Sequence, residues 1–154
     1  MSQIKSYLEA ITATYKAHAP VYARVLVEHG KTFKPNAECR AYMAPKQCYG
    51  NATEKVINDD RFTYAEGLGV AAKIGVAVPL HHAWLVNAHG QAHDPTWGDT
   101  FGNEYFGVMF SRDFILEFVE RTGHVSVFES LYLLRMTPEA CYDYVVSGVI
   151  TPKV

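Results

Sequence analysis

The sequence predicts an α+β fold, in which a small antiparallel sheet is flanked by N-terminal and C-terminal helices. Near both ends of the chain, apolar residues recur every three or four positions, which is typical of amphipathic helices. The middle carries short β-branched and aromatic runs separated by glycine, proline and asparagine, which favour strands. A chain of 154 residues is about the size of one domain, so we expect a single domain over residues 1–154.

Helical periodicity covers the N-terminal part of the chain. Over residues 2–18 the apolar side chains recur at spacings of three and four, which places them on one helix face. Pro20 suits the first turn of a second helix over residues 21–29, because its missing N–H has no helical partner there. Gly30 follows as a C-terminal stop. We therefore expect two packed N-terminal helices, or one kinked helix.

The next segments lead to Cys48 and into the predicted sheet. Residues 31–47 contain two prolines and no clear period, so we expect a connecting loop. Helical spacing returns over residues 48–58, which places Cys48 at a helix N-terminus. Residues 61–70 alternate loosely and contain two glycines, which predicts a strand lying close to another part of the chain.

Three further strands complete the predicted sheet. Residues 76–87 are β-branched, aromatic and alternating, and Pro79 indicates a bulge or a late start. A hairpin connection at residues 88–90 leads into a short strand over residues 91–94. The last strand is expected at residues 104–110.

The C-terminal third returns to helices. Ser111 is a good N-cap for a helix whose apolar side chains share one face, and Gly123 ends it. Residues 125–135 are apolar enough for a strand or a buried helix, and we favour the helix. Thr137 is then the N-cap, followed by proline at the first helical position, for a last helix that runs to about residue 147.

The composition argues against several classes of function. Apolar residues make up 49% of the chain, which is enough to form a core. The formal net charge is −2 and no block of Lys or Arg occurs, so we expect neither a nucleic-acid partner nor an anionic membrane. The longest weakly polar run, residues 67–80, is shorter than the roughly 20 residues that span a bilayer.

The start of the chain and its cysteines bear on location. The first residues have no apolar core of the signal-peptide type, so export by that route is not expected. The cysteines are an odd, sparse set of three without a CxxC pair, which favours a reducing cytoplasm.

Cys48 is the candidate nucleophile. A free thiol is mostly protonated at neutral pH, so a nucleophilic cysteine needs its thiolate favoured by a helix N-terminus or a nearby imidazolium. We expect Cys48 to have both, the second from the histidine-rich stretch that begins at His81. Cys39 and Cys141 are interpreted as buried, inert side chains, with Cys141 on the inner face of the last helix.

The candidate base and carboxylate follow from a parity argument. In an antiparallel hairpin, directly paired residues point to the same face, and the sum of their numbers is constant. If the connection has an odd number of residues, that sum is even, and His82, Trp84 and Asp94 share one face. Asp94 would then accept a hydrogen bond from the His82 ring and stabilise its charged form. An even connection would place His82 and Asp94 on opposite faces.

The other histidines of this stretch are interpreted as strand or surface residues. His81 should point away from His82 by strand alternation. His89 lies at the predicted hairpin tip, and His93 should face away from Asp94. Together these five side chains also allow a metal-binding alternative, because His and Asp side chains bind zinc and related ions. Their spacing matches no standard ligand pattern.

Three tripeptides occur in a characteristic order: Gln47-Cys48-Tyr49, His82-Ala83-Trp84 and Asp94-Pro95-Thr96. They resemble the nucleophile, base and carboxylate segments of the transglutaminase-like branch of the papain-like cysteine enzymes, over about a third of the chain. The resemblance implies a papain-like or transglutaminase-like core and a Cys48–His82–Asp94 triad. It also implies a thioester on Cys48, formed from an amide with loss of ammonia or an amine.

The resemblance extends to substrate binding, with two departures from the family pattern. The backbone N–H of Cys48 would hold the oxyanion, and Gln47, Tyr49 and Trp84 are candidate substrate-binding residues. Tyr49 stands where the family has tryptophan, which keeps an aromatic ring and adds a hydroxyl. The segments are also closely spaced and lack an acidic calcium site, which favours a minimal hydrolase or deamidase over a calcium-dependent crosslinker.

The sequence therefore predicts a cysteine hydrolase or acyl transferase that acts on an amide of a protein or peptide substrate, without a cofactor. Deamidation of protein glutamine, transamidation and peptide cleavage stay open, as does the oligomeric state. One alternative is a catalytically silent protein-binding module of the same fold. The other is a His/Asp metal-binding protein.

Overall fold

Five strands form one antiparallel sheet in the part of the chain that the structure describes. This computed structural model describes residues 3–15, 18–36, 39–72, 78–98 and 102–151. The strands are β1 (Lys31–Phe33), β2 (Thr63–Val70), β3 (Leu80–Val86), β4 (Ala92–His93) and β5 (Glu104–Phe110). Their order across the sheet is β1-β5-β2-β3-β4, and each neighbouring pair is antiparallel. The predicted α+β class is confirmed.

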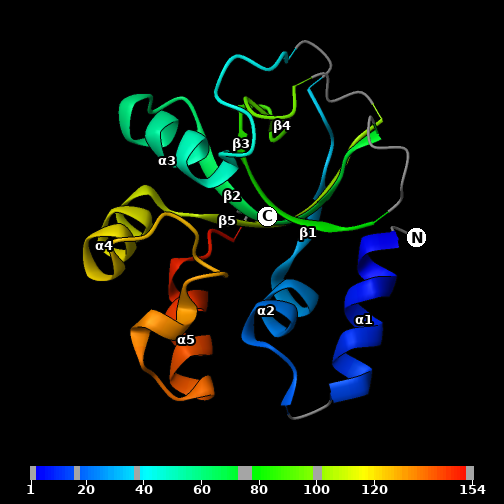
Figure 1. The fold of residues 1–154 in the computed structure, drawn as a ribbon, viewed down its shortest axis with the longest axis vertical. Coiled ribbons are helices and arrows are strands. Elements are labelled where there is room, and N and C mark those ends of the chain that lie inside the picture. The colour runs from blue at the N-terminus through cyan, green and yellow to red at the C-terminus, as the bar shows by residue number, and fades with distance from the viewer. Residues whose placement is uncertain (1–2, 16–17, 37–38, 73–77, 99–101, 152–154) are drawn as a thin grey trace.

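The sheet curls into a half-barrel whose outer strands approach each other (Figure 1). The N–H of Ala92 in β4 donates to Lys34 O at 2.8 Å, and Ala92 O accepts from the N–H of Asn36 at 2.8 Å. The segment after β1 is thereby joined to β4. The prediction of a loop over residues 31–47 was wrong at its start, because Lys31–Phe33 pairs with β5. A three-residue edge strand is too short to show an alternating pattern.

Two glycines let β2 lie close to its surroundings, as the sequence predicts. A Cβ atom on Gly67 would lie 2.2 Å from Phe106 O in β5, so a side chain cannot be accommodated without moving backbone. A Cβ atom on Gly69 would lie 2.9 Å from the Trp97 ring. Because the two residues are two apart in β2, they lie on the same face of the strand, and that face has no side chain at either position.

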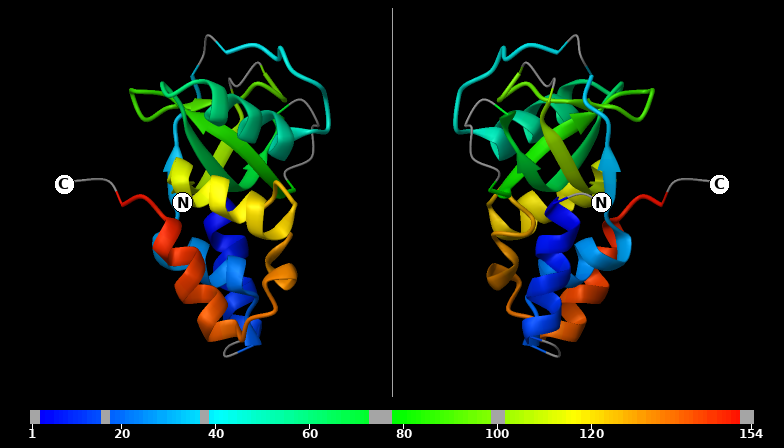
Figure 2. Two further views of the ribbon diagram at one scale, coloured as in Figure 1. Left: turned by 90° about the vertical axis from the view of Figure 1, so that its left-hand side faces the viewer. Right: turned by 90° about the vertical axis from the view of Figure 1, so that its right-hand side faces the viewer.

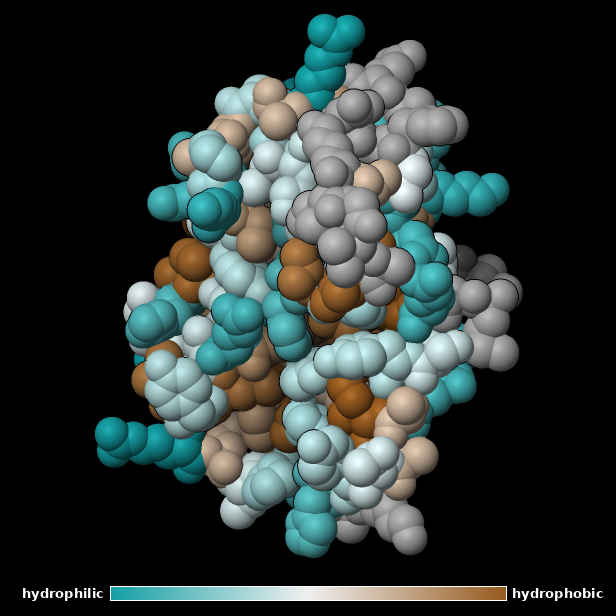
Figure 3. All heavy atoms as spheres, turned by 45° about the vertical axis from the view of Figure 1, so that its right-hand side comes forward, coloured by the Kyte–Doolittle hydropathy of each residue, from teal (hydrophilic) through white to brown (hydrophobic). Residues whose placement is uncertain are grey.

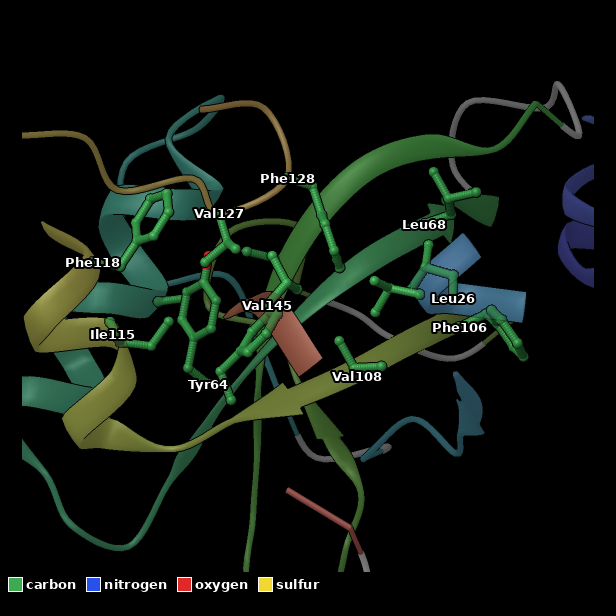
Figure 4. Packing of buried hydrophobic residues seen from close by; sticks show 14 of the residues in the cluster. Leu26, Tyr64, Leu68, Phe106, Val108, Ile115, Phe118, Val127, Phe128 and Val145 are labelled. Carbon is green, nitrogen blue, oxygen red and sulfur yellow. The ribbon is translucent and has the colours of Figure 1, made fainter. Parts of the chain in front are cut away.

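The helices gather on one side of the sheet. Helices α1 (Gln3–Tyr15), α2 (Val21–His29) and α5 (Pro138–Gly148) lie below the sheet in Figure 1, with α3 (Cys48–Asn58) and α4 (Arg112–Thr122) beside it. The views in Figure 2 show the same division into a sheet half and a helical half. The main core fills the space between them, where Tyr64 and Val108 of the sheet meet Ile115 of α4 and Val145 of α5 (Figure 4).

A second, smaller apolar cluster lies on the other face of the sheet, around the site described below. It contains one residue or more from each strand: Phe33, Ala65, Trp84, Val86, Ala92 and Tyr105.

Local signals fix most helix ends. The Ser111 side chain accepts from the N–H of Phe114, as an N-cap does, and Gly123 ends α4 with a left-handed φ of 71°. Thr137 caps α5 in the same way by accepting from the N–H of Ala140. Helix α3 has the predicted bounds.

Two predicted elements differ from the structure. Residues 125–135 do not form one helix, and only η3 (Leu131–Leu134) is helical, as a short 3-10 turn. The reason is tertiary, because the N–H groups of Val127 and Phe128 donate to the buried Glu66 carboxylate. The strand predicted over residues 76–87 starts late, at Leu80, as Pro79 indicated; residues 76 and 77 lie outside the described residues.

The surface is mixed in character. On the face in Figure 3, apolar side chains form separate patches among hydrophilic ones. Within the described ranges, no helix is long and apolar enough to cross a bilayer.

Candidate functional site

The hairpin of β3 and β4 brings His82 and Asp94 together. Val86 pairs with Ala92 and Leu85 with His93, so the connection has five residues, 87–91. This number is odd, and the sum of paired residue numbers is therefore even. The prediction of an odd connection and a shared face is thereby confirmed, although the loop is longer than three residues. The His82 Nε2 and Asp94 Oδ2 atoms are 2.7 Å apart, and the two residues are 1% and 0% exposed.

Asp94 accepts four hydrogen bonds. Its Oδ1 atom accepts from the backbone N–H groups of Thr96 and Trp97, both at 3.0 Å. Its Oδ2 atom accepts from His82 and also from the Tyr105 hydroxyl at 2.8 Å. Burial alone would raise the pKa of Asp94, but the hydrogen bond and charge of His82, with those from Trp97 and Tyr105, hold it below its usual value. Asp94 is therefore an ionised, fully satisfied carboxylate at neutral pH.

A polar chain behind Asp94 was not predicted from the sequence. Asn103 Nδ2 donates to the Tyr105 hydroxyl at 3.0 Å, and Asn103 Oδ1 accepts from the N–H of Ala72 at 2.8 Å. Tyr105 belongs to β5, which β2 separates from the β3–β4 hairpin. The Tyr105 side chain reaches Asp94 across β2 because Gly67 and Gly69 have no side chains that would lie between the two residues.

Aromatic rings fix the orientation of the His82 imidazole. Trp97 stacks on it with a centroid distance of 3.5 Å and an interplanar angle of 8°. Trp97 in turn lies over Gly69. Because Nε2 is engaged by Asp94, Nδ1 is the ring nitrogen left to exchange a proton with another group.

Cys48 is the first residue of α3 and shares a cleft of about 420 Å³ with His82. The cleft is lined by Lys46, Cys48, Tyr49, Leu80, His81, His82, Thr96, Trp97 and Glu129. Asn51 ties α3 to the segment after Asp94, because its Nδ2 donates to Thr96 Oγ1 at 2.9 Å and to Ala44 O at 2.8 Å. Among the described residues, no direct hydrogen bond joins Cys48 to His82.

The resting state of Cys48 differs from the expectation. Burial raises the pKa of its thiol to about 11, with further increases from Glu66 and Asp94, while the N–H groups of Ala83 and Tyr49 act in the opposite direction. Burial thus outweighs these two hydrogen bonds and favours the neutral form of the thiol. Cys48 is therefore a protonated thiol at neutral pH, and forming its thiolate would require a base.

The three predicted substrate-binding residues have different positions. Tyr49 lines the cleft. Gln47 is exposed, its side chain makes no capping bond to α3, and it is not part of the cleft wall. Trp84 is 0% exposed and packs edge-on against Phe33 with a centroid distance of 5.7 Å, so it is a core residue rather than a substrate contact. Its ring belongs to the smaller apolar cluster.

The histidines do not assemble a metal site. His89 is exposed at the hairpin tip, and the His93 ring lies 3.2 Å from the Tyr42 hydroxyl. His81 packs edge-on against Tyr22, yet it also lines the cleft, which strand alternation alone did not predict. Over the described ranges, no three His, Cys, Asp or Glu side chains are placed to share a metal ion.

The other two thiols are buried, as expected. Cys39 is 3% exposed and its Sγ donates to Asp94 O at 3.2 Å. Cys141 is 5% exposed and belongs to the main core.

Comparison with known proteins gives no match to a family model, to a curated protein or to a solved structure. What the chain does must be inferred from the side chains of the cleft.

Proposed function

We propose that this protein is a cysteine-dependent hydrolase or acyl transferase that acts on an amide of a protein or peptide. The observation that carries the proposal is the buried 2.7 Å hydrogen bond between His82 and Asp94, beside a cleft that Cys48 also lines. A base oriented by a carboxylate next to a nucleophile is the arrangement that acyl transfer requires. The cleft volume is within the range of small-ligand sites.

The raised pKa of Cys48 decides how the first step runs. His82 Nδ1 removes the thiol proton as Sγ attacks the amide carbonyl carbon, so that no thiolate has to exist beforehand. The resulting imidazolium is stabilised by Asp94. The oxyanion accepts a hydrogen bond from the Cys48 N–H, which has no partner within α3 because it belongs to the first turn.

The imidazolium then protonates the leaving nitrogen, the C–N bond breaks, and ammonia or an amine departs from a thioester on Cys48. In hydrolysis, His82 removes a proton from water as the water oxygen attacks the thioester carbon. In transamidation an amine attacks instead. In both cases the C–S bond breaks and the proton returns to Sγ.

The order of elements supports a transglutaminase-like core. The helix that begins with the cysteine comes after the short edge strand β1 and before β2 to β5, with the histidine on β3 and the aspartate directly after β4. We propose a cytoplasmic location, because all three cysteines are free thiols.

Intact-mass analysis tests the function. The protein is incubated with a panel of glutamine-containing peptides, with and without an added primary amine. A gain of about one dalton identifies deamidation, an amine adduct transamidation, and fragments proteolysis. We expect one of these products with the wild type and none with Cys48→Ala. Equal product with Cys48→Ala would disprove the role of Cys48.

A catalytically silent binding module is the second candidate. It is favoured by the protonated thiol and by the missing direct hydrogen bond between Cys48 and His82 in the described residues. In that case the peptide panel gives no product, whereas a peptide that binds the cleft protects Cys48 from alkylation.

A further inference from the structure

One wall of the cleft comes from the segment between α4 and η3, residues 123–130. Glu129 lies on this segment, is exposed and lines the cleft together with Cys48 and His82. Its backbone is fixed, because its N–H donates to Ser126 Oγ at 3.1 Å. The proposed triad makes no use of this wall.

The wall is anchored to the sheet by Glu66, a β2 residue that is 1% exposed. The carboxylate accepts from the N–H groups of Val127 and Phe128 at 2.9 and 2.7 Å and from the Ser126 hydroxyl at 3.3 Å. Tyr64 donates a further bond at 2.6 Å. A buried carboxylate is costly unless it is hydrogen-bonded, and three of these four bonds hold the turn that precedes Glu129.

Three acidic side chains, Glu66, Asp94 and Glu129, act on the groups that line the cleft. Cys48 is influenced by the carboxylates of Glu66 and Asp94, Tyr49 by those of Glu66 and Glu129, and His81 by that of Glu129. Lys46 is the one Lys or Arg side chain among the described residues that line the cleft, and it is exposed. Glu129 alone of the three carboxylates is accessible to a ligand.

We propose that Glu129 is a specificity-determining residue, which selects amide substrates that carry a positive charge, such as a Lys or Arg side chain, close to the scissile amide. Glu66 is the positioning residue that holds Glu129 at the cleft. This inference rests on the proposed function for its reaction, but the charge selection is a property of the cleft that can be measured without turnover.

Charged thiol reagents measure this property directly. The full-length protein is treated with a trimethylammonium-bearing methanethiosulfonate, its sulfonate-bearing counterpart and neutral methyl methanethiosulfonate. The rate at which each reagent modifies Cys48 is measured by peptide mass mapping. It is then divided by the rate at which the same reagent modifies 2-mercaptoethanol, which removes differences in intrinsic reactivity. We expect the normalised cation-to-anion ratio to exceed one in the wild type. Glu129→Gln should lower it on the order of fivefold, the scale of one Coulomb interaction near a protein surface.

Matched variants separate the role of Glu129 from net charge. Glu120→Gln removes the same charge from an exposed position on α4 outside the cleft, and should leave the ratio unchanged. Ser126→Ala removes one bond to Glu66 and the bond from the Glu129 N–H, while the two backbone bonds to Glu66 stay in place, and it should lower the ratio partly.

The outcomes distinguish this inference from the proposed function. If the neutral reagent modifies Cys48 but Glu129→Gln leaves the ratio unchanged, or the anionic reagent is preferred, charge selection by Glu129 is wrong and the triad stands. If none of the three reagents modifies Cys48, the thiol is closed to small molecules and both proposals fail.

Discussion

The Nε2 atom of His82 lies 2.7 Å from Asp94 Oδ2, with both side chains almost fully removed from solvent. Such a pair is costly to bury, and its desolvation is offset only when all hydrogen-bonding groups are satisfied. Asp94 meets this condition with four donors. The pair thus fixes the tautomer and orientation of the imidazole at the edge of the cleft.

Asp94→Asn tests the orienting role. The amide keeps the shape of the carboxylate but cannot accept from all four donors or stabilise an imidazolium. We expect turnover to fall by about 10²–10⁴-fold, and the free energy of unfolding to fall by about 1–3 kcal/mol as buried donors lose their acceptor. Enzyme assays and urea titrations measure the two effects. Wild-type turnover in this variant would rule out the triad.

Tyr105→Phe tests the polar chain behind the carboxylate. Removal of the hydroxyl takes away one donor to Asp94 Oδ2, so Asp94 becomes a stronger acceptor for the imidazolium. The acidic limb of the pH–rate profile should move to higher pH by about 0.5–1 unit, equivalent to a hydrogen bond of ~1 kcal/mol. A purely structural role for Tyr105 would lower the rate at every pH without moving this limb.

Glu66 should make stability depend on pH. Burial raises its pKa from 4.5 to about 7, against the opposing effect of its hydrogen bonds from Tyr64 and the backbone of the turn. Its stabilising contribution is therefore complete below pH 4.5 and is lost as pH rises through about 7, by about 3 kcal/mol.

Urea unfolding between pH 4 and 8 measures this effect as the difference between the wild type and Glu66→Gln, which cannot ionise. The stability advantage of the wild type over Glu66→Gln should shrink as pH rises through about 7. The control variant Glu54→Gln, on the exposed side of α3, should depend on pH like the wild type. A difference that does not depend on pH would mean that Glu66 does not titrate in this range.

Gly67→Ala tests the close approach of β2 and β5. The added Cβ would lie 2.2 Å from Phe106 O and 2.5 Å from Gly107 Cα, so the strands must separate. We expect a loss of more than about 3 kcal/mol in the free energy of unfolding, measured by thermal or urea unfolding. Gly50→Ala in α3 is the control, because nothing lies within 4 Å of its added Cβ, and helix propensity alone predicts a gain of up to about 1 kcal/mol.

Features governed by local chemistry could be predicted from the sequence. The caps at Ser111 and Thr137 depend on a side chain and an N–H group three residues away, which the sequence displays directly. The pairing of His82 with Asp94 is similarly local, because a hairpin joins its strands through a short loop and parity alone decides the shared face.

Features that depend on the order of strands could not be predicted in this way. Tyr105 reaches Asp94 only because β5 lies beside β2 and the sheet curls, and nothing near Tyr105 in the sequence indicates this contact. The Glu66 carboxylate accepts hydrogen bonds from the N–H groups of Val127 and Phe128, which lie about sixty positions later in the chain. Residues 125–135 therefore form a turn here and not the predicted helix. The resting charge of Cys48 depended on burial, which the helix-terminus argument did not include.

The central claim is that His82 serves as the base for Cys48. Its most direct measurement is the rate of alkylation of Cys48 by iodoacetamide from pH 6 to 10, in the wild type and in His82→Ala, with circular dichroism to verify folding. At pH 7 the wild type should react about 10²-fold faster than His82→Ala. The rate of the variant should rise about tenfold per pH unit towards the thiol pKa of about 11. Equal rates in the two proteins, or faster alkylation of Cys39 or Cys141 than of Cys48, would contradict the claim.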